Sequence, residues 1–163
     1  MRKRFEQQLE LGGLSISEVE IDKRSRHELP QLLSGLQYIF ITPSINTKIF
    51  ELLEQKVTGD KNKTGRLGMS LWEILVLGVV RLNLNIDYDN LQDLANHHAS
   101  VRGILGVHKL TSDWSSKKYY PLQTLKDNVR LLDEEILSQL NELVVDCGHT
   151  IKKTKEEEKE MIC

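Results

Sequence analysis

The stretch from Leu71 to Leu84 constrains the fold of this chain more than any other part of the sequence. It reads LWEILVLGVVRLNL, and Glu73 and Arg81 are its only charged residues. A helix that is apolar nearly all round is buried at the centre of its domain. A bilayer span needs about 20 apolar residues, and this stretch is shorter and interrupted by charge. We therefore predict a buried central helix and no membrane span.

Apolar residues at helical spacing, together with start and stop signals, predict further helices on both sides of this stretch. Ser70 and Glu73 form an S-x-x-E capping box in front of the central helix. No run of residues has the alternation of a strand. The predicted fold class is all-α, a multi-helix bundle. The other predicted helix boundaries are Pro30, Thr42 with Pro43, Asp87 or Asp89, Gly106, Pro121, Asp133 and Gly148.

The two ends of the chain differ from this helical centre. Residues 1–27 contain Gly12 and Gly13 and fit neither a period of 2 nor one of 3.6, which predicts an extended N-terminal arm. Residues 28–150 are expected to form the helical domain. Residues 151–163 contain the run KKTKEEEKEMIC, which has almost nothing to bury, and we expect a disordered tail there.

The distribution of charge is uneven along the chain. Residues 56–130 hold eleven Lys or Arg against seven Asp or Glu, although the net charge of the whole chain is −2. A basic centre between acidic ends permits a nucleic-acid surface, but an excess of this size is also common on solvated faces. The chain has two cysteines and no apolar segment after its basic start, so a reducing compartment and no signal peptide are expected.

The segment from Tyr88 to Val107 has the dimensions of a helix-turn-helix unit, with two short helices joined by a polar turn at residues 96–98. In such a unit the second helix enters the major groove and its N-terminal side chains contact bases or phosphates. Those side chains would be His98, Ser100 and Arg102. The alternative is a plain helical hairpin in which Arg102 braces the fold by pairing with Asp93 or a neighbouring acid.

Two predicted loops carry further cations. A glycine-containing loop holds Lys61, Lys63 and Arg66, which can follow a phosphate backbone or can simply be solvated. The second loop holds Lys109 and the run Lys117-Lys118-Tyr119-Tyr120, where cations next to aromatic rings suit phosphate contact and base stacking. The alternative for this run is a rim loop with its tyrosine rings tucked onto the core. The predicted DNA-binding residues are therefore Lys61, Lys63, Arg66, His98, Ser100, Arg102, Lys109, Lys117 and Lys118.

Several classes of chemistry lack the residues that they require. His97 and His98 are adjacent and diverge on a helix, and Cys147 and His149 have no second pair at metal-ligand spacing, so no metal site is predicted. The sequence contains no G-x-S-x-G motif, no Walker loop and no G-x-G-x-x-G motif. We expect no catalytic residues and no cofactor in this chain.

The run from Lys63 to Val107 resembles the N-terminal helical domain of bacterial insertion-sequence transposases of the Asp-Asp-Glu type, in particular the group called ISNCY. The resemblance lies in Gly65-Arg66-Leu67-Gly68-Met69, in Trp72-Glu73-Ile74-Leu75, and in the helix pair from Leu91 to Gly106 with its Arg102-x-x-Leu105-Gly106 ending. Flanking similarity at residues 28–39 and 122–129 extends it over about residues 23–151. Leu67 departs from the family, where proline is expected.

The resemblance implies a function that composition alone does not. The N-terminal domain of the family is thought to bind the terminal inverted repeats of the element, inside the bacterial cytoplasm and associated with the nucleoid. A following RNase H-like domain carries three carboxylates with two divalent metal ions for strand cleavage and transfer. The tail suits a truncated copy, and no match to those carboxylates is found at Asp87, Asp89, Asp93, Asp113, Asp127 or Asp146. We therefore expect DNA binding without catalysis.

Two alternatives to this reading remain. The chain can be a helical module that assembles transposase protomers without touching DNA, with intact transposase or a second copy as its partner. It can also act in catalysis only as part of a longer or complemented protein. If the chain is a DNA-binding domain, its expected partner is DNA that carries the terminal repeats. No membrane partner is expected under any of the three interpretations.

Overall fold

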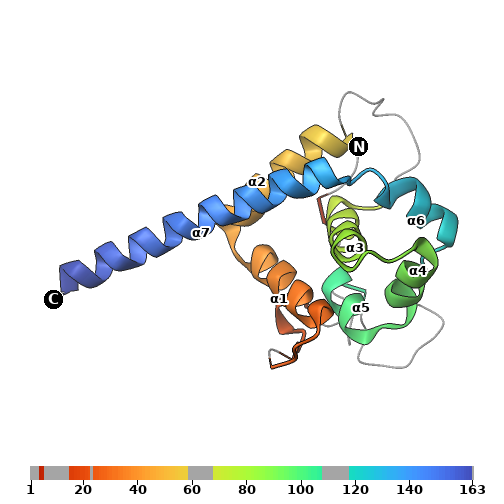
Figure 1. Cartoon of the computed structure of the whole chain (residues 1–163), viewed down its shortest axis with the longest axis horizontal. Helices are drawn as coiled ribbons and strands as arrows, with labels where there is room; N and C mark the ends of the chain where they lie inside the picture. The colour runs from red at the N-terminus through yellow and green to blue at the C-terminus, as the bar shows by residue number, and fades with distance from the viewer. Residues whose placement is uncertain (1–3, 6–14, 23, 59–67, 108–117, 163) are drawn as a thin grey trace.

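The structure is a computed structural model that describes residues 4–5, 15–22, 24–58, 68–107 and 118–162; at residues 58, 147–155, 158 and 162 it describes the backbone alone. The described residues are helical and contain no strand, which confirms the predicted all-α class. Figure 1 shows a body of short helices from which one long helix projects. In chain order the helices are η1 (Ile16–Glu18), α1 (Glu28–Ile41), α2 (Pro43–Leu53), the π-helix η2 (Glu54–Thr58), α3 (Leu71–Leu84), α4 (Tyr88–His97), α5 (Ala99–Leu105), α6 (Leu122–Val129) and α7 (Glu134–Ile162).

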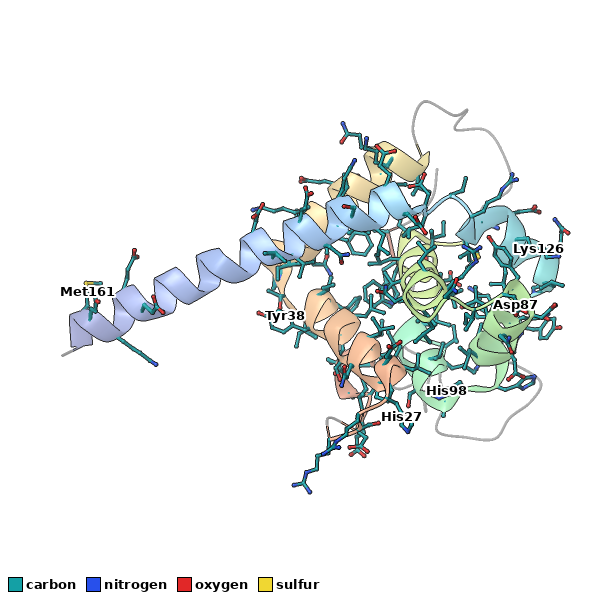
Figure 2. The ribbon with its side chains drawn as sticks, viewed as in Figure 1. His27, Tyr38, Asp87, His98, Lys126 and Met161 are labelled. Carbon is teal, nitrogen blue, oxygen red and sulfur yellow. The ribbon has the colours of Figure 1, made fainter. Side chains whose placement is uncertain are left out.

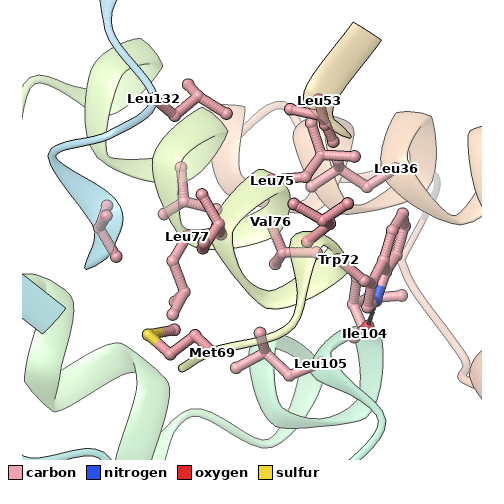
Figure 3. Packing of buried hydrophobic residues seen from close by; sticks show 14 of the residues in the cluster. Leu36, Leu53, Met69, Trp72, Leu75, Val76, Leu77, Ile104, Leu105 and Leu132 are labelled. Atoms are coloured by element: carbon pink, nitrogen blue, oxygen red, sulfur yellow. Dashed lines mark hydrogen bonds between the residues drawn. The ribbon is translucent and has the colours of Figure 1, made fainter. Parts of the chain in front are cut away.

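Helix α3 is the centre of the body, as the apolar stretch predicts. Nine of its residues are buried, and α1, α4, α5 and α6 all contact it. Figure 3 shows its side chains extending in several directions into this core. Gly78 lies so close to Leu132 that an added Cβ would meet the leucine side chain at 3.0 Å. A helix with neighbours on every side can bury an almost wholly apolar surface, and this explains its composition.

Trp72 joins five parts of the chain at one point. Its ring lies 5.0 Å from the Phe40 ring of α1 and 6.4 Å from the rings of Phe5 and Phe50, measured between centroids. Its indole Nε1 donates a 2.7 Å hydrogen bond to the carbonyl of Ile104 in α5 (Figure 3). Trp72 is fully buried, so the indole donor would be unsatisfied without this acceptor.

Most of the predicted capping residues lie where the sequence places them. Ser70 and Glu73 form the expected capping box of α3. The carboxylates of Asp87 and Asp133 accept from the amides of Asn90 and Ile136, at the starts of α4 and α7. Gly106 ends α5 in the left-handed conformation, with a φ of 80°. These confirmed boundaries depend on contacts over three or four residues, which the sequence shows directly.

The described part of the N-terminal arm is packed against the body. Ile16 is fully buried and Val19 is 8% exposed. The side-chain amide of Gln37 on α1 donates to the carbonyls of both residues, at 2.9 Å each. Gly103 of α5 faces Val19 so closely that an added Cβ would lie 2.9 Å from its methyl groups. The described residues of the arm therefore contribute to the core through Ile16 and Val19.

The C-terminal part of the chain differs from the prediction. The sequence predicts a helix end at Gly148 and a disordered tail from residue 151, whereas α7 is one helix from Glu134 to Ile162. The tail residues are mainly lysine and glutamate, which have high intrinsic helix propensity and allow the helix to continue without burial. Figure 1 shows the distal part of α7 projecting away from the other helices, with the C-terminus at its far end.

A partly open cavity of about 270 Å³ lies between α1, α2, α3 and α7. Its wall is mainly apolar, with Leu36, Ile49, Leu75 and Leu140 among the lining residues. Gly35 of α1 also lines it, and a Cβ added there would meet nothing within 4 Å. Among the helices of the described residues, none combines the length and the apolar character that crossing a membrane requires.

Candidate nucleic-acid interface

The predicted DNA-binding residues fall into two groups. His98, Ser100, Arg102 and Lys118 belong to the described residues. The others lie outside the part of the chain that the structure describes, so their predicted role stays a prediction; they are Lys61, Lys63, Arg66, Lys109 and Lys117.

Helix α5 does not have the exposure that a recognition helix needs. It follows α4 after a single residue, His98, and the two helices do form the predicted compact pair. However, the five residues from Val101 to Leu105 are all buried, and α5 contacts α1, α3, α4 and η1. A helix that enters the major groove must leave one face free for the bases. The recognition-helix interpretation of α5 is therefore corrected: α5 is a core helix.

Arg102 is the clearest correction, because it is only 4% exposed. Its guanidinium donates from Nη1 to the carbonyl of Ala95 and from Nη2 to the carbonyl of Lys118, both at 2.9 Å. Burial lowers the pKa of this guanidinium from its ordinary value. Arg102 thus braces the fold, as the alternative held, although its hydrogen-bond acceptors are carbonyl oxygens and not the carboxylate of Asp93.

His98 and Ser100 are both half-buried at the start of α5. The Nδ1 atom of His98 accepts a 3.3 Å hydrogen bond from the amide of Val101, so the imidazole caps the helix. Figure 2 shows His98 at this end of α5. The capping contact occupies one ring nitrogen, and it gives His98 a structural role that the sequence did not indicate.

The short segment from Lys118 to Tyr120 is held by side chains of α4 and α5. Asn96 is 3% exposed and makes two hydrogen bonds to Tyr120, accepting from its amide at 2.7 Å and donating to its carbonyl at 3.0 Å. Gln92 donates to the same carbonyl at 3.2 Å. With Arg102 on the Lys118 carbonyl, the segment has polar contacts at both of its ends. Buried polar side chains satisfied in this way fix a backbone in one conformation.

Glu73 of α3 connects this segment to the central helix. Its carboxylate accepts from the Lys118 ammonium at 2.7 Å and from the Tyr120 hydroxyl at 2.6 Å, and it also accepts from Ser70. Burial opposes ionisation of Glu73, but the hydrogen bonds from Lys118 and Tyr120 outweigh it, so the pKa of the carboxyl is lowered from its ordinary value. Burial, and then the Glu73 charge, raise the pKa of Tyr120 well above its ordinary value.

Lys118 and Tyr119 are the two side chains that the fixed segment presents to solvent. The Lys118 side chain is 50% exposed although its ammonium contacts Glu73. Tyr119 is 63% exposed, and its hydroxyl accepts a 3.1 Å hydrogen bond from Gln92. Tyr120, in contrast, is 1% exposed. We call the pair Lys118 and Tyr119 the platform, because they are the exposed side chains of a segment whose backbone is held by buried hydrogen bonds.

The platform also marks where two predicted basic loops attach to the body. The loop with Lys61, Lys63 and Arg66 returns to the described chain at Gly68, two residues before Ser70. The loop with Lys109 and Lys117 returns at Lys118. Ser70 and Lys118 both hydrogen-bond to the carboxylate of Glu73. The described residues that follow the two loops in the chain, Ser70 and Lys118, are therefore joined through Glu73 in the first turn of α3.

The described residues do not assemble the ligands of a metal ion, since they contain no group of three or more His, Cys, Asp or Glu side chains. The residues that sequence reasoning missed at this site are Gln92 and Asn96. The run Lys117-Lys118-Tyr119-Tyr120 was identified from the sequence, but which of its two tyrosines is exposed was not. The two amides had no comparable signal, since their partners lie more than twenty residues away.

We expect the Glu73 contacts to make stability depend on acid pH. Because the folded pKa lies below the unfolded one, this stabilisation is present above the ordinary pKa of 4.5 and is lost as the pH falls through the lowered value. Urea unfolding between about pH 6 and pH 3 should show a steeper loss of stability in the wild type than in Glu73→Gln, which cannot ionise. Parallel pH profiles for the two proteins would contradict the ionised Glu73 described here.

In comparisons with known proteins, the chain matches no family model, no curated protein and no solved structure. A functional assignment therefore depends on the residues themselves and on the resemblance described for residues 23–151. The structural observations that bear on it are the polar contacts of residues 118–120 and the hydrogen bonds of Ser70 and Lys118 to Glu73.

Proposed function

We propose that this chain is the DNA-binding N-terminal part of an insertion-sequence transposase, and that it holds the terminal inverted repeats of the element without performing strand chemistry. The observation that supports the proposal is that Ser70 and Lys118, which lie just after the two predicted basic loops in the sequence, both hydrogen-bond to Glu73 beside the exposed platform. Cations on separate segments that start from one point can contact successive phosphates along a duplex. The resemblance supplies the identity of the DNA.

The buried α5 changes how this binding would work. A chain that inserted α5 into the major groove would have to unpack the five buried residues from Val101 to Leu105. We therefore assign the DNA contacts to Lys61, Lys63, Arg66, Lys109, Lys117 and Lys118, with His98 and Ser100 at the edge of the same body. Arg102 supports the interface from inside, through the Lys118 carbonyl.

The proposal predicts a salt-dependent affinity for DNA that falls when a loop cation is removed. Lys63→Ala should weaken binding to the element's end and to random DNA alike, and it should lower the slope of log K against log salt by about one unit. Lys159→Ala is the matched control, because Lys159 is an exposed lysine on the distal part of α7. Fluorescence anisotropy across a salt series measures both slopes. An unchanged slope in Lys63→Ala, or equal losses in both variants, would contradict the assignment.

A second candidate function is protein assembly, and the long α7 favours it. Met161 is 86% exposed and Val145 is 55% exposed, and α2 is the element that α7 contacts most. An isolated helix gains little stability in water, so a partner along α7 would stabilise it. Intact transposase or a second copy of this chain would be that partner. Sedimentation that shows self-association, combined with no affinity for any DNA, would favour assembly over DNA binding.

A further inference from the structure

We infer that the platform stacks Tyr119 on an unpaired base, so that the chain binds single-stranded or frayed DNA through this site in preference to an intact duplex. The inference rests on the proposed function. It adds a ligand class that the proposed function does not name: a nucleotide whose base has left the double helix. It depends on three described features: the exposure of Tyr119, the hydrogen bonds that hold the residues on either side of it, and the neighbouring cation of Lys118.

The exposure of Tyr119 is unusual for its surroundings. The neighbouring Tyr120 is buried and hydrogen-bonded to Glu73, whereas the Tyr119 ring is 63% exposed. Its hydroxyl accepts a hydrogen bond from Gln92, which contacts the ring at its polar tip. The ring surface therefore remains available to a ligand. Aromatic rings of this kind bind bases by stacking, which every base permits and which requires the base to be unstacked from its neighbours.

The support behind Tyr119 is what separates it from an ordinary exposed ring. Asn96 and Arg102 are both nearly fully buried, and every hydrogen bond described above for Asn96 goes to Tyr120, while Arg102 uses Nη2 on Lys118. Two polar side chains are thus buried in order to fix the residues on either side of Tyr119. A fixed backbone lowers the entropy that a ring loses when a ligand orders it.

Lys118, which precedes Tyr119 in the chain, adds a positive charge to the proposed nucleotide site. The Lys118 ammonium lies 5.2 Å from the centroid of Tyr120 and contacts Glu73, and half of the side chain is exposed. A single strand offers a phosphate next to each base, so a lysine and an exposed tyrosine at consecutive positions can contact the phosphate and the base of neighbouring nucleotides. In a paired duplex the base faces are covered, and only the phosphate contact remains.

The test compares a labelled thymidine oligonucleotide with a mixed-sequence hairpin duplex, using anisotropy with the full chain. Tyr119→Ala and Tyr119→Leu should weaken single-strand binding about five- to hundredfold and duplex binding less than about twofold. Tyr119→Phe keeps the ring and should bind the single strand like the wild type. Tyr38→Ala is the matched control: Tyr38 is 48% exposed on α1, across the body from Lys126 of α6 (Figure 2), and its removal should change neither affinity.

The outcomes separate this inference from the proposed function. If the wild type binds neither DNA, the proposed function fails and the inference fails with it. If the wild type binds the duplex with normal salt dependence while Tyr119→Ala leaves single-strand affinity unchanged, the inference alone is overturned. Equal losses on both DNAs also overturn it, because they show a general surface contact. A Tyr119→Phe variant as weak as Tyr119→Ala would assign the contact to the hydroxyl and likewise reject stacking.

Discussion

Replacing Trp72 with alanine should lower the free energy of unfolding by about 3–5 kcal/mol. The indole is fully buried where the arm, α1, α2, α3 and α5 meet, and it contacts the rings of Phe5, Phe40 and Phe50. Removing it leaves a cavity that rigid helices on several sides cannot close. It also leaves the Ile104 carbonyl without its side-chain donor. Urea unfolding followed by circular dichroism measures the loss.

Two further variants make this result interpretable. Trp72→Phe keeps an aromatic ring without the Nε1 donor, so its stability should lie between those of the wild type and the alanine variant, and it serves if Trp72→Ala does not fold. Ile41→Ala removes a large apolar side chain that is 52% exposed and should cost less than about 0.5 kcal/mol. A Trp72→Ala loss as small as that of Ile41→Ala would mean that α3 is not the centre of the core.

Arg102→Ala is the second substitution with a large expected effect, of about 3 kcal/mol on unfolding. The guanidinium forms two charged hydrogen bonds, to Ala95 and Lys118, and the variant leaves both carbonyls without these donors. Because the lost contacts hold the platform, affinity should fall on specific and on random DNA alike. Thermal unfolding and anisotropy on both DNAs give the two measurements.

The matched control for Arg102 is Arg130→Ala, which removes an exposed arginine just after α6. Its effect on unfolding should stay within about 0.5 kcal/mol. A contrary outcome for Arg102 would be unchanged stability together with a loss on the specific DNA alone. That pattern is typical of a base contact and would restore the recognition-helix interpretation of α5.

The parts of the fold that the sequence predicts correctly are governed by neighbours in the chain. The Ser70 and Glu73 capping box, the Asp87 and Asp133 caps and the glycine stop at Gly106 involve residues at most four positions apart. The burial of α3 is predictable for a different reason. A helix without a polar face has no stable position except a central one.

The features that the sequence does not predict depend on distant partners. Arginine is usually exposed, and the burial of Arg102 depends on a carbonyl sixteen residues away. Ile16 lies in a stretch without periodicity, and its burial depends on the packing of η1 against α1 and α5. For α7, the low apolar content of the tail suggested disorder, but helix propensity does not require burial.

The candidate site also has one feature that the sequence predicts and one that depends on a distant partner. The run of cations and tyrosines at residues 117–120 is visible in the sequence and predicts a place for nucleic-acid contact. Which tyrosine is exposed is not visible, because that depends on Glu73, which accepts from the Tyr120 hydroxyl forty-seven residues away. The same contact explains why Tyr119, and not Tyr120, is left available.

Because α7 is long and projects from the body, a small change in its packing angle would displace its far end by a large distance. From Val144 to Ile162 the helix extends about 27 Å at 1.5 Å per residue, so a tilt of about 10° at its seat would move its far end by about 5 Å. The part of α7 that packs on the body includes Leu137, Leu140 and Val144, which line the partly open cavity beneath the helix. A partly open cavity beneath this part of α7 lowers the resistance to tilting, because fewer side-chain contacts must be broken there. A larger side chain at position 35 would partly fill the cavity, and it should therefore restrict the direction in which the far end of α7 points.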